Sequence, residues 1–240
     1  MCVKVICTFN NQEIFDKVVK NNENIKNAEL FAYDNTKDNV GIPSRYNAFL
    51  SDAVGSDSND SKDFWCVFIH QDFGIMEDIN SVVAKLDKNS IYGAVGVKIF
   101  KGLFWGKKHE LNQEVSFGFK NELKLTYGRI LQGNNDFNFK PHGRKLYFRA
   151  TVDAIDCCCI IIHSSLIRKH NLRFDENLSF HMYAEELCYS AKKNYKIKTK
   201  VVQMNCYHMG KGTFNDEYKK SAQYLKDKFK INKIPSVCPN

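Results

Sequence analysis

The sequence has few of the features that mark fibrous, disordered or membrane-spanning proteins. Only 4 of its 240 residues are proline and 13 are glycine, which excludes a collagen-like repeat and a proline-rich disordered chain. The longest apolar run, residues 154–162, is interrupted by Asp156 and is far shorter than the roughly 20 residues that cross a bilayer. The first residues also lack the basic segment and long apolar stretch of a signal peptide. We therefore expect a cytoplasmic protein that folds around its own core.

Two common nucleotide-binding motifs are missing, and the cysteines follow no known framework. Neither G-x-G-x-x-G nor G-x4-G-K-[ST] occurs, which argues against a dinucleotide-dependent dehydrogenase and a P-loop enzyme. Nine cysteines are present, three of them consecutive at 157–159. This spacing is typical of neither a disulfide-bonded domain nor a structural zinc site, so we expect reduced thiols.

Positive charge is in excess but is spread along the chain. The net charge of +8 favours anionic partners, yet no basic stripe with stacking aromatics is present, so we expect no nucleic-acid binding. The densest basic stretch is 219–230, where Tyr218, Ala222, Leu225 and Phe229 recur at helical spacing. This pattern predicts an amphipathic helix within 214–240 that packs on the core. A second interpretation is peripheral contact of this lysine-rich helix with the anionic inner face of a membrane.

Strand-like and helix-like segments alternate along the chain, which is typical of an α/β fold. The apolar patterns predict strands over 3–9, 30–33, 64–69, 91–100, 152–162 and 197–203. Helices are expected after Asn11 and Ser44, from Ile79 to Leu86, from Ser164 and over 182–193. Residues 55–62 read as a loop and 101–150 as hairpins and irregular loops. We expect a single Rossmann-like domain with a mostly parallel central sheet flanked by helices.

Polar side chains follow several of the predicted strands, where open α/β sheets bind their ligands. Acids are numerous among them, and a hard divalent cation that bridges carboxylates to a diphosphate suits such a set. The residues concerned are Thr8, Asn10, Asp34, Asn35, His70, Gln71, Asp72, Asp156 and His208, together with Glu185 and Glu186 at the start of a helix.

In their order and spacing these segments resemble one family. The segments are Val5 to Asn10, Tyr33 to Asn35, Ser44 to Asn47, Phe68 to Asp72, Val152 to Asp156, Phe174 to Glu176, Phe180-His181, Tyr183 to Cys188, and Tyr207-His208 followed by Gly210 and Gly212. Together they are similar to the nucleotide-sugar-dependent glycosyltransferases of the family 2 type with the GT-A fold. The likeness is to the small bacterial members that carry His-x-Asp in place of Asp-x-Asp.

The resemblance implies a metal-dependent, inverting transfer of a sugar from a nucleoside diphosphate sugar to a glycan or lipid-linked acceptor. The implied donor is a UDP-sugar, the implied cation Mn²⁺ or Mg²⁺, and the implied role bacterial surface polysaccharide or glycoconjugate synthesis. Residues 1–100 would form the nucleotide-sugar half of a 1–213 domain and 151–213 the acceptor and catalytic half. The implied donor contacts are Thr8, Asn10, Asp34, Asn35, Arg45, Asn47, His70 and Gln71, and the implied metal ligands are Asp72 and His208.

The acidic cluster differs from the family pattern at one position. Relatives show Tyr-Asp-x-Asp-Leu-Cys, whereas this chain has Ala184 at the first acid, followed by Glu185 and Glu186. We take Glu185 as the expected base, with Glu186 and Asp156 as alternates. Because Ala184 replaces an acid, a catalytically degenerate sugar-nucleotide-binding protein is a second hypothesis, and a basic nucleic-acid-binding protein is a third. Each residue also has a structural interpretation: Asp34 and Asn35 can shape a turn, Asp72 can cap a helix, and His70 can line the site without binding metal.

Overall fold

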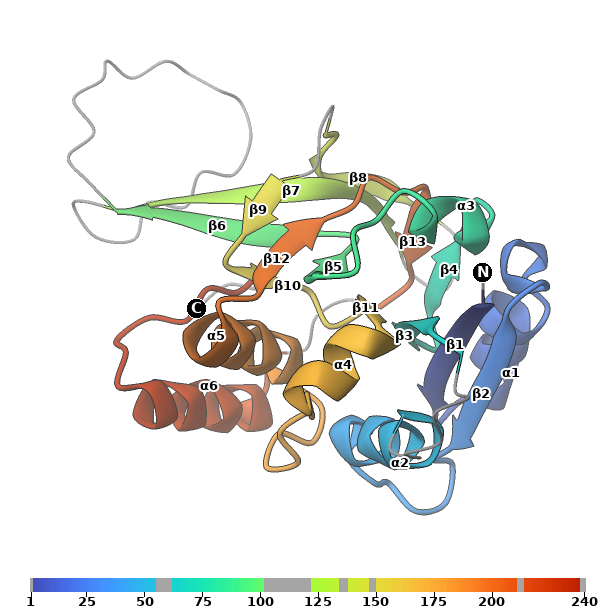
Figure 1. Cartoon of the computed structure of the whole chain (residues 1–240), viewed down its shortest axis with the longest axis horizontal. Coiled ribbons are helices and arrows are strands. Elements are labelled where there is room, and N and C mark those ends of the chain that lie inside the picture. The colour runs from blue at the N-terminus through green and yellow to red at the C-terminus, as the bar shows by residue number, and fades with distance from the viewer. Residues whose placement is uncertain are drawn as a thin grey trace.

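The computed structural model describes residues 2–54, 62–101, 122–133, 138–146, 150–210 and 214–237. The elements pack into two sheets with helices around them (Figure 1). Within the described ranges no helix combines the length and hydropathy needed to cross a membrane. The eight cysteines in these ranges are free thiols. The expected loop over 55–62 and much of the irregular 101–150 region lie outside the described residues.

The central sheet has seven strands in the order β2-β1-β3-β11-β5-β12-β9. Parallel pairs join β1 to β2 and β3, and β5 to β12, whereas β11 and β9 run antiparallel to their neighbours. Five of the seven strands thus share one direction, as expected for a mostly parallel sheet. The strands are β1 (Cys2–Phe9), β2 (Glu29–Asp34), β3 (Phe64–His70), β5 (Ser90–Gly93), β9 (Ala150–Val152), β11 (Cys159–His163) and β12 (Lys198–Val201).

The second sheet has the order β10-β6-β7-β13-β4, with β8 paired to β7. It brings the middle of the chain and its last strand beside the turn that follows β3. Its strands are β4 (Phe73–Ile75), β6 (Gly96–Lys101), β7 (Glu122–Gln132), β8 (Lys140–Arg144), β10 (Ala154–Ile155) and β13 (Cys206–His208).

Two predicted strands are divided in the structure. The expected strand 91–100 separates into β5 and β6, which belong to different sheets, and the expected strand 152–162 separates into β9, β10 and β11. Side chains explain the second division. Asp153 accepts a hydrogen bond from the Ile99 amide, and Asp156 accepts one from the Cys158 amide in the turn before β11. When an Asp side chain accepts a hydrogen bond from a nearby backbone amide, it can interrupt the regular pairing of a β-strand, even within an apolar stretch of sequence.

The helices follow the predicted pattern closely. Asn11 caps α1 (Gln12–Phe15) by accepting from the Ile14 amide, and the chain continues through a π-helical turn (Asp16–Lys20) and a 3-10 turn (Glu23–Ile25). α2 (Ile42–Val54) begins two residues before the expected cap Ser44, since Pro43 fits the first turn of a helix. The others are α3 (Ile79–Val83), α4 (Ser164–His170), α5 (Tyr183–Tyr195) and α6 (Asp216–Phe229).

Two apolar clusters cover the two faces of the central sheet. On β3, Phe64, Cys66 and Phe68 belong to one cluster, and Trp65, Val67 and Ile69 belong to the other, because alternate side chains of a strand point to opposite faces. The first cluster includes residues of α2, α4, α5 and α6, and the second includes residues of α1 and α3. In Figure 1, α5 and α6 lie side by side, away from the long β6–β7 hairpin.

Candidate functional site

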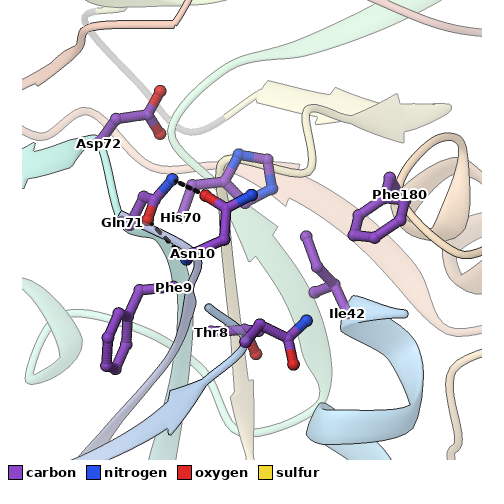
Figure 2. A pocket seen from close by; sticks show the side chains of 9 residues that line it. Thr8, Phe9, Asn10, Ile42, His70, Gln71, Asp72 and Phe180 are labelled. Atoms are coloured by element: carbon purple, nitrogen blue, oxygen red, sulfur yellow. Dashed lines mark hydrogen bonds between the residues drawn. The ribbon is translucent and has the colours of Figure 1, made fainter. Parts of the chain in front are cut away.

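The carboxyl ends of β1 and β3 meet at one edge of the central sheet. Thr8 pairs in register with His70, and Phe9 pairs with Asp34 on β2. A cavity of about 340 Å³, here called the first cavity, opens at this edge (Figure 2). It collects six of the residues that the sequence singled out. The lining residues are Thr8, Phe9, Asn10, Asn35, Ile42, His70, Gln71, Asp72 and Phe180.

An amide pair joins the two strand ends. The Gln71 side-chain oxygen accepts from the backbone amides of Asn10 and Asn11, each at 2.9 Å, and the Gln71 amide nitrogen donates to Asn10 Oδ1 at 2.7 Å (Figure 2). These bonds hold the turn after β1 against the turn after β3. Nearby, Thr8 Oγ1 is buried and has no hydrogen-bond partner within the described residues. A buried hydroxyl without a partner is costly, so this atom is available to a ligand.

Asn35 lines the first cavity, and Arg45 lies behind it. The Asn35 side chain is buried and accepts from Arg45 Nε at 3.0 Å. Arg45 also lies 3.5 Å from an oxygen of Asp38. Asp34 lies outside the lining: its carboxylate accepts from the Thr36 amide at 2.8 Å, and this bonding lowers the pKa of Asp34. Arg45 therefore supports the cavity through Asn35, and Asp34 shapes the turn beside it.

Asn47 serves a different part of the structure. Its side-chain amide donates to the Phe174 carbonyl at 2.9 Å and to Glu176 Oε1 at 2.8 Å, while its oxygen accepts from the Phe174 amide at 2.9 Å. These bonds anchor the segment that leads to Phe180, a residue of the first cavity. Asn47 itself is not among the residues that line the cavities described here.

His70, Asp72 and His208 form a cluster of metal-ligand type. One ligand atom from each lies within 4.8 Å of the others. The β4–β13 pairing places His208 opposite Phe73, and the Met209 amide donates to the Asp72 carbonyl at 3.0 Å. The closest contact joins His208 Nε2 to Asp72 Oδ1 at 3.3 Å. The expected pair Asp72 and His208 thus comes together, and His70, expected only as a lining residue, joins it.

The surroundings of this cluster favour the ionised form of Asp72. Burial opposes ionisation, but the hydrogen bond and positive charge of His208 outweigh it and lower the pKa of Asp72 to about 2. Burial lowers the pKa of His208, but the hydrogen bond to Asp72 and its negative charge raise that pKa by more, so the pKa of His208 is raised overall. At His70 the effect of burial is larger than that of Asp72, so the pKa of His70 is lowered. A carboxylate oxygen and two imidazole nitrogens are donor atoms that can hold a divalent cation.

Gly210 leaves the space that such a cation requires. A Cβ atom at this position would lie 2.5 Å from Asp72 Oδ2 and 3.2 Å from two ring atoms of His208. The open side of the cluster is thus kept clear by a residue without a side chain. The three donors and this free space together fit a divalent cation.

A second cavity, of about 600 Å³, shares His70, Asp72 and Phe180 with the first. It also contains His208, so the metal-type cluster borders both cavities. Asp156 and Glu185 add two more carboxylates to that of Asp72. Much of the remaining wall is apolar and comes from separate parts of the chain: Val95, Ile130, Cys157 and Cys158, Phe180 and Met182, Phe214 and Tyr218, and Val237.

Glu185 has one carboxylate oxygen without a partner. The side chain is 7% exposed; Oε1 accepts from Ser236 Oγ at 2.7 Å, and Oε2 has no hydrogen-bond partner among the described residues. Burial raises the pKa of Glu185 to about 7. The negative charge of Asp156 also raises this pKa, whereas the hydrogen bond from Ser236 lowers it. A carboxylate tuned to this range and facing a cavity is typical of a general base.

The two alternate acids differ from Glu185 in their surroundings. Glu186 accepts from Ser190 Oγ at 2.6 Å and from Lys228 Nζ at 2.8 Å, and it lines a separate cavity beside α6. Asp156 lies in the second cavity, where its Oδ1 accepts from the Cys158 amide at 2.9 Å. Ala184 is buried in the core. Of the three candidate acids, Glu185 alone combines a cavity position with a buried oxygen that lacks a partner.

The sequence analysis assigned no role to several residues that lie in or beside the site. His142 lines the second cavity from β8, within the region that showed no regular pattern. The Tyr183 hydroxyl lies 2.7 Å from His70 Nε2. Ser236 follows the last helix, in a stretch without a motif. Phe180 belongs to a segment that resembles the family, but no role was assigned to it.

The comparisons with known proteins give structural matches only. No protein-family model and no curated protein matches the sequence. Among the solved structures that match are two that are similar across nearly the whole chain. GalNAc-T7, solved with UDP, GalNAc and Mn²⁺, matches with a TM-score of 0.51 and 9% identity, covering 96% of this chain and 49% of that one. TarS from S. aureus matches with a TM-score of 0.50 and 10% identity, covering 95% and 39%.

The chain therefore spans about half the length, or less, of these two proteins. Both are glycosyltransferases of the GT-A fold. The match shows that the chain has the GT-A fold, as the sequence predicted.

Proposed function

We propose that the chain is a metal-dependent glycosyltransferase that moves a sugar from a nucleoside diphosphate sugar to an acceptor hydroxyl with inversion. The observation that carries the proposal is the position of the His70, Asp72 and His208 cluster on the border of two cavities. The first cavity lies at the carboxyl ends of the strands, where open α/β sheets bind nucleotides, and is lined by several polar side chains. The second cavity is lined by Glu185, whose buried Oε2 has no partner among the described residues. The structural similarity to GalNAc-T7, solved with UDP and Mn²⁺, supports the same assignment.

The first cavity would bind the nucleotide. Thr8 offers its unpartnered hydroxyl, and Asn10 and Asn35 line the same space. Arg45 would hold Asn35 in place, Gln71 would hold Asn10, and Asn47 would act from further away through the segment before Phe180. Asp34 directly precedes the lining residue Asn35. The family resemblance implies a contact of Asp34 with the base or ribose of a uridine nucleotide.

The cation, Mn²⁺ or Mg²⁺, would be held by Asp72 and His208 with His70 as a third ligand. When bound, such a cation stabilises the negative charge that develops on the departing diphosphate. The protein's own contribution is an Asp72 that is ionised at all physiological pH values, because its pKa is lowered to about 2. Tyr183 restrains the His70 ring through the contact at Nε2.

Glu185 would act as the base. An acceptor hydroxyl in the second cavity would donate its proton to Glu185 Oε2, on the side of the sugar opposite the diphosphate, since attack and departure are in line. Glu186 and Asp156 remain the alternates. The bonds of Glu186 to Ser190 and Lys228 favour Glu185 over it.

The acceptor would be a glycan or a lipid-linked sugar, as in bacterial surface polysaccharide synthesis. The largely apolar wall of the second cavity supports an acceptor with an apolar face or tail. A cytoplasmic enzyme at the inner face of a membrane would contact lipid through α6. Because α6 buries Tyr218 and Leu225 against the protein, that contact would be electrostatic, through exposed lysines such as Lys219 and Lys220.

A thermal-shift screen of nucleotide sugars with and without MnCl₂, followed by a transfer assay on the stabilising donor, tests the proposal. We expect a cation-dependent rise in Tm with one class of nucleotide sugar and release of nucleoside diphosphate on turnover. The presence of Ala184 in the acidic segment motivates the alternative of a sugar-nucleotide-binding protein. Metal-dependent binding without any turnover supports that alternative, and salt-sensitive binding to oligonucleotides without donor binding supports a nucleic-acid role.

A further inference from the structure

The chain after α6 returns to the start of α5. Lys228 near the end of α6 pairs with Asp175 at 2.5 Å and with Glu186 at 2.8 Å, which joins the two helices. Beyond the helix, Ile234 is buried in the core cluster and Ser236 is 0% exposed. Ile234 and Ser236 therefore anchor the segment 231–237 to the folded protein next to the site.

Ser236 contacts one of the two oxygens of Glu185. A serine hydroxyl has a single proton, and Ser236 Oγ donates it to Glu185 Oε1 at 2.7 Å. The other oxygen, Oε2, is buried and has no partner among the described residues. Val237, next to Ser236, lines the second cavity together with Glu185. The hydrogen bond thus engages one oxygen and leaves the other for a ligand in the cavity.

We propose that Ser236 is a positioning residue for the base Glu185: it fixes the carboxylate so that Oε2 faces the acceptor hydroxyl. This inference rests on the proposed function. In a buried site an acid without a fixed partner rotates between side-chain conformers, and only one of them aims a lone pair at the acceptor. Orientation of a catalytic group by a neighbouring hydrogen bond is a general device of enzyme active sites.

The same hydrogen bond affects the ionisation of Glu185. Burial raises the pKa of Glu185, and so does the negative charge of Asp156. The hydrogen bond from Ser236, a backbone hydrogen bond and the more distant charge of Lys124 on β7 lower it. Asp72, His142, His181 and His208 also line the second cavity. Removal of the Ser236 hydroxyl leaves all these groups in place and removes the first of the three interactions that favour the carboxylate.

The experiment compares Ser236→Ala and Ser236→Thr with the wild type in Mn²⁺-dependent transfer, with kcat measured from pH 5 to 9. Ser221→Ala is the matched control, because Ser221 is a buried serine of α6 that has no bond to Glu185 in the structure. We expect Ser236→Ala to lower kcat about tenfold, to leave the donor KM unchanged, and to move the lower pH midpoint up by roughly half a unit or more. Ser236→Thr keeps the hydroxyl and should restore the midpoint, and in a Glu185→Gln background Ser236→Ala should have no further effect.

Three outcomes are distinguishable. A wild-type chain that binds donor but transfers no sugar overturns the proposed function and this inference with it. An active wild type whose Ser236→Ala variant keeps both kcat and pH midpoint overturns the inference alone. A variant that lowers kcat at every pH without moving the midpoint also overturns it, since a purely structural role would do this. If Ser236→Ala fails to fold, Ser236→Cys keeps the volume with a weak donor and replaces it in the comparison.

Discussion

Glu185 and Glu186 are adjacent in α5, yet their carboxylates lie in two different cavities. Glu185 lies in the second cavity beside Ser236, and Glu186 pairs with Lys228 on α6. The separation follows from the rotation of about 100° per residue along a helix. Two neighbouring acids therefore have a chemical and a structural role that mutation can separate.

Glu185→Gln should lower kcat for sugar transfer by a hundredfold or more, because the amide keeps the shape and removes the basicity. Donor affinity should stay within about twofold of the wild type. Glu186→Gln should keep activity and lower the free energy of unfolding by about 1 kcal/mol, or roughly 2–4 °C in Tm, since Lys228 retains Asp175 as a partner. Steady-state kinetics and thermal unfolding measure both. The assignment is wrong if the two variants exchange these effects.

The stability of the protein should fall as pH rises through the range in which Glu185 ionises. The pKa of the Glu185 carboxyl is about 4.5 in the unfolded chain and about 7 in the folded protein. Between these values the folded state binds the proton more tightly, so its release at higher pH destabilises the fold, by about 3 kcal/mol at most. Urea unfolding of the wild type and Glu185→Gln at pH 4, 6 and 8 measures this. The glutamine variant should gain relative stability above pH 5, whereas activity should rise with pH in the wild type.

Asp72→Asn should reduce Mn²⁺ affinity by at least tenfold while leaving the fold intact, because the amide can still bond to His208 but offers no anionic oxygen. Metal-stimulated transfer should be lost. Asp227→Asn, which removes the same charge from the exposed face of α6, serves as the control and should bind Mn²⁺ like the wild type. Calorimetric titration with MnCl₂ gives both affinities, and equal affinities for the two variants would exclude Asp72 as a ligand.

Gly210→Ala should weaken cation binding with little loss of stability. The new Cβ would lie 2.5 Å from Asp72 Oδ2, which is the end of a side chain and can move aside. The displaced carboxylate no longer faces the His70 and His208 nitrogens correctly, so we expect roughly a tenfold or greater loss of Mn²⁺ affinity. Thermal unfolding without metal should be close to that of the wild type. A large drop in Tm without metal would show that Gly210 serves packing instead.

Thr8→Val should affect binding and stability in opposite ways. Valine keeps the shape and removes the buried hydroxyl that has no partner within the described chain, so the free energy of unfolding should stay equal or rise by up to about 1 kcal/mol. Donor affinity should fall about threefold to tenfold because the hydroxyl contact is lost. Equilibrium binding of a UDP-sugar in the presence of MnCl₂ tests this, and unchanged affinity would place the nucleotide away from Thr8.

Local patterns in the sequence determined most elements and the composition of the first cavity. The apolar run of β3 is buried at Phe64 to Ile69 because both sheet faces are covered. Asn11 caps α1 as its residue type predicts. The rule that parallel strands present their carboxyl ends at one edge brought Thr8, Asn10, Asn35, Gln71 and Asp72 together. These features depend on residue type and periodicity within a few positions, which one sequence contains.

Tertiary contacts alone decided the rest. The apolar run from 152 to 162 does not reveal where Asp153 and Asp156 bond to backbone and divide it. Helix geometry separates Glu185 from Glu186, but which of the two faces the second cavity depends on how α5 packs against α6, where Lys228 pairs with Glu186. Ser236 is 51 residues beyond Glu185 in the chain, and nothing local indicates their contact. The positions of these groups follow from long-range packing, which periodicity does not encode.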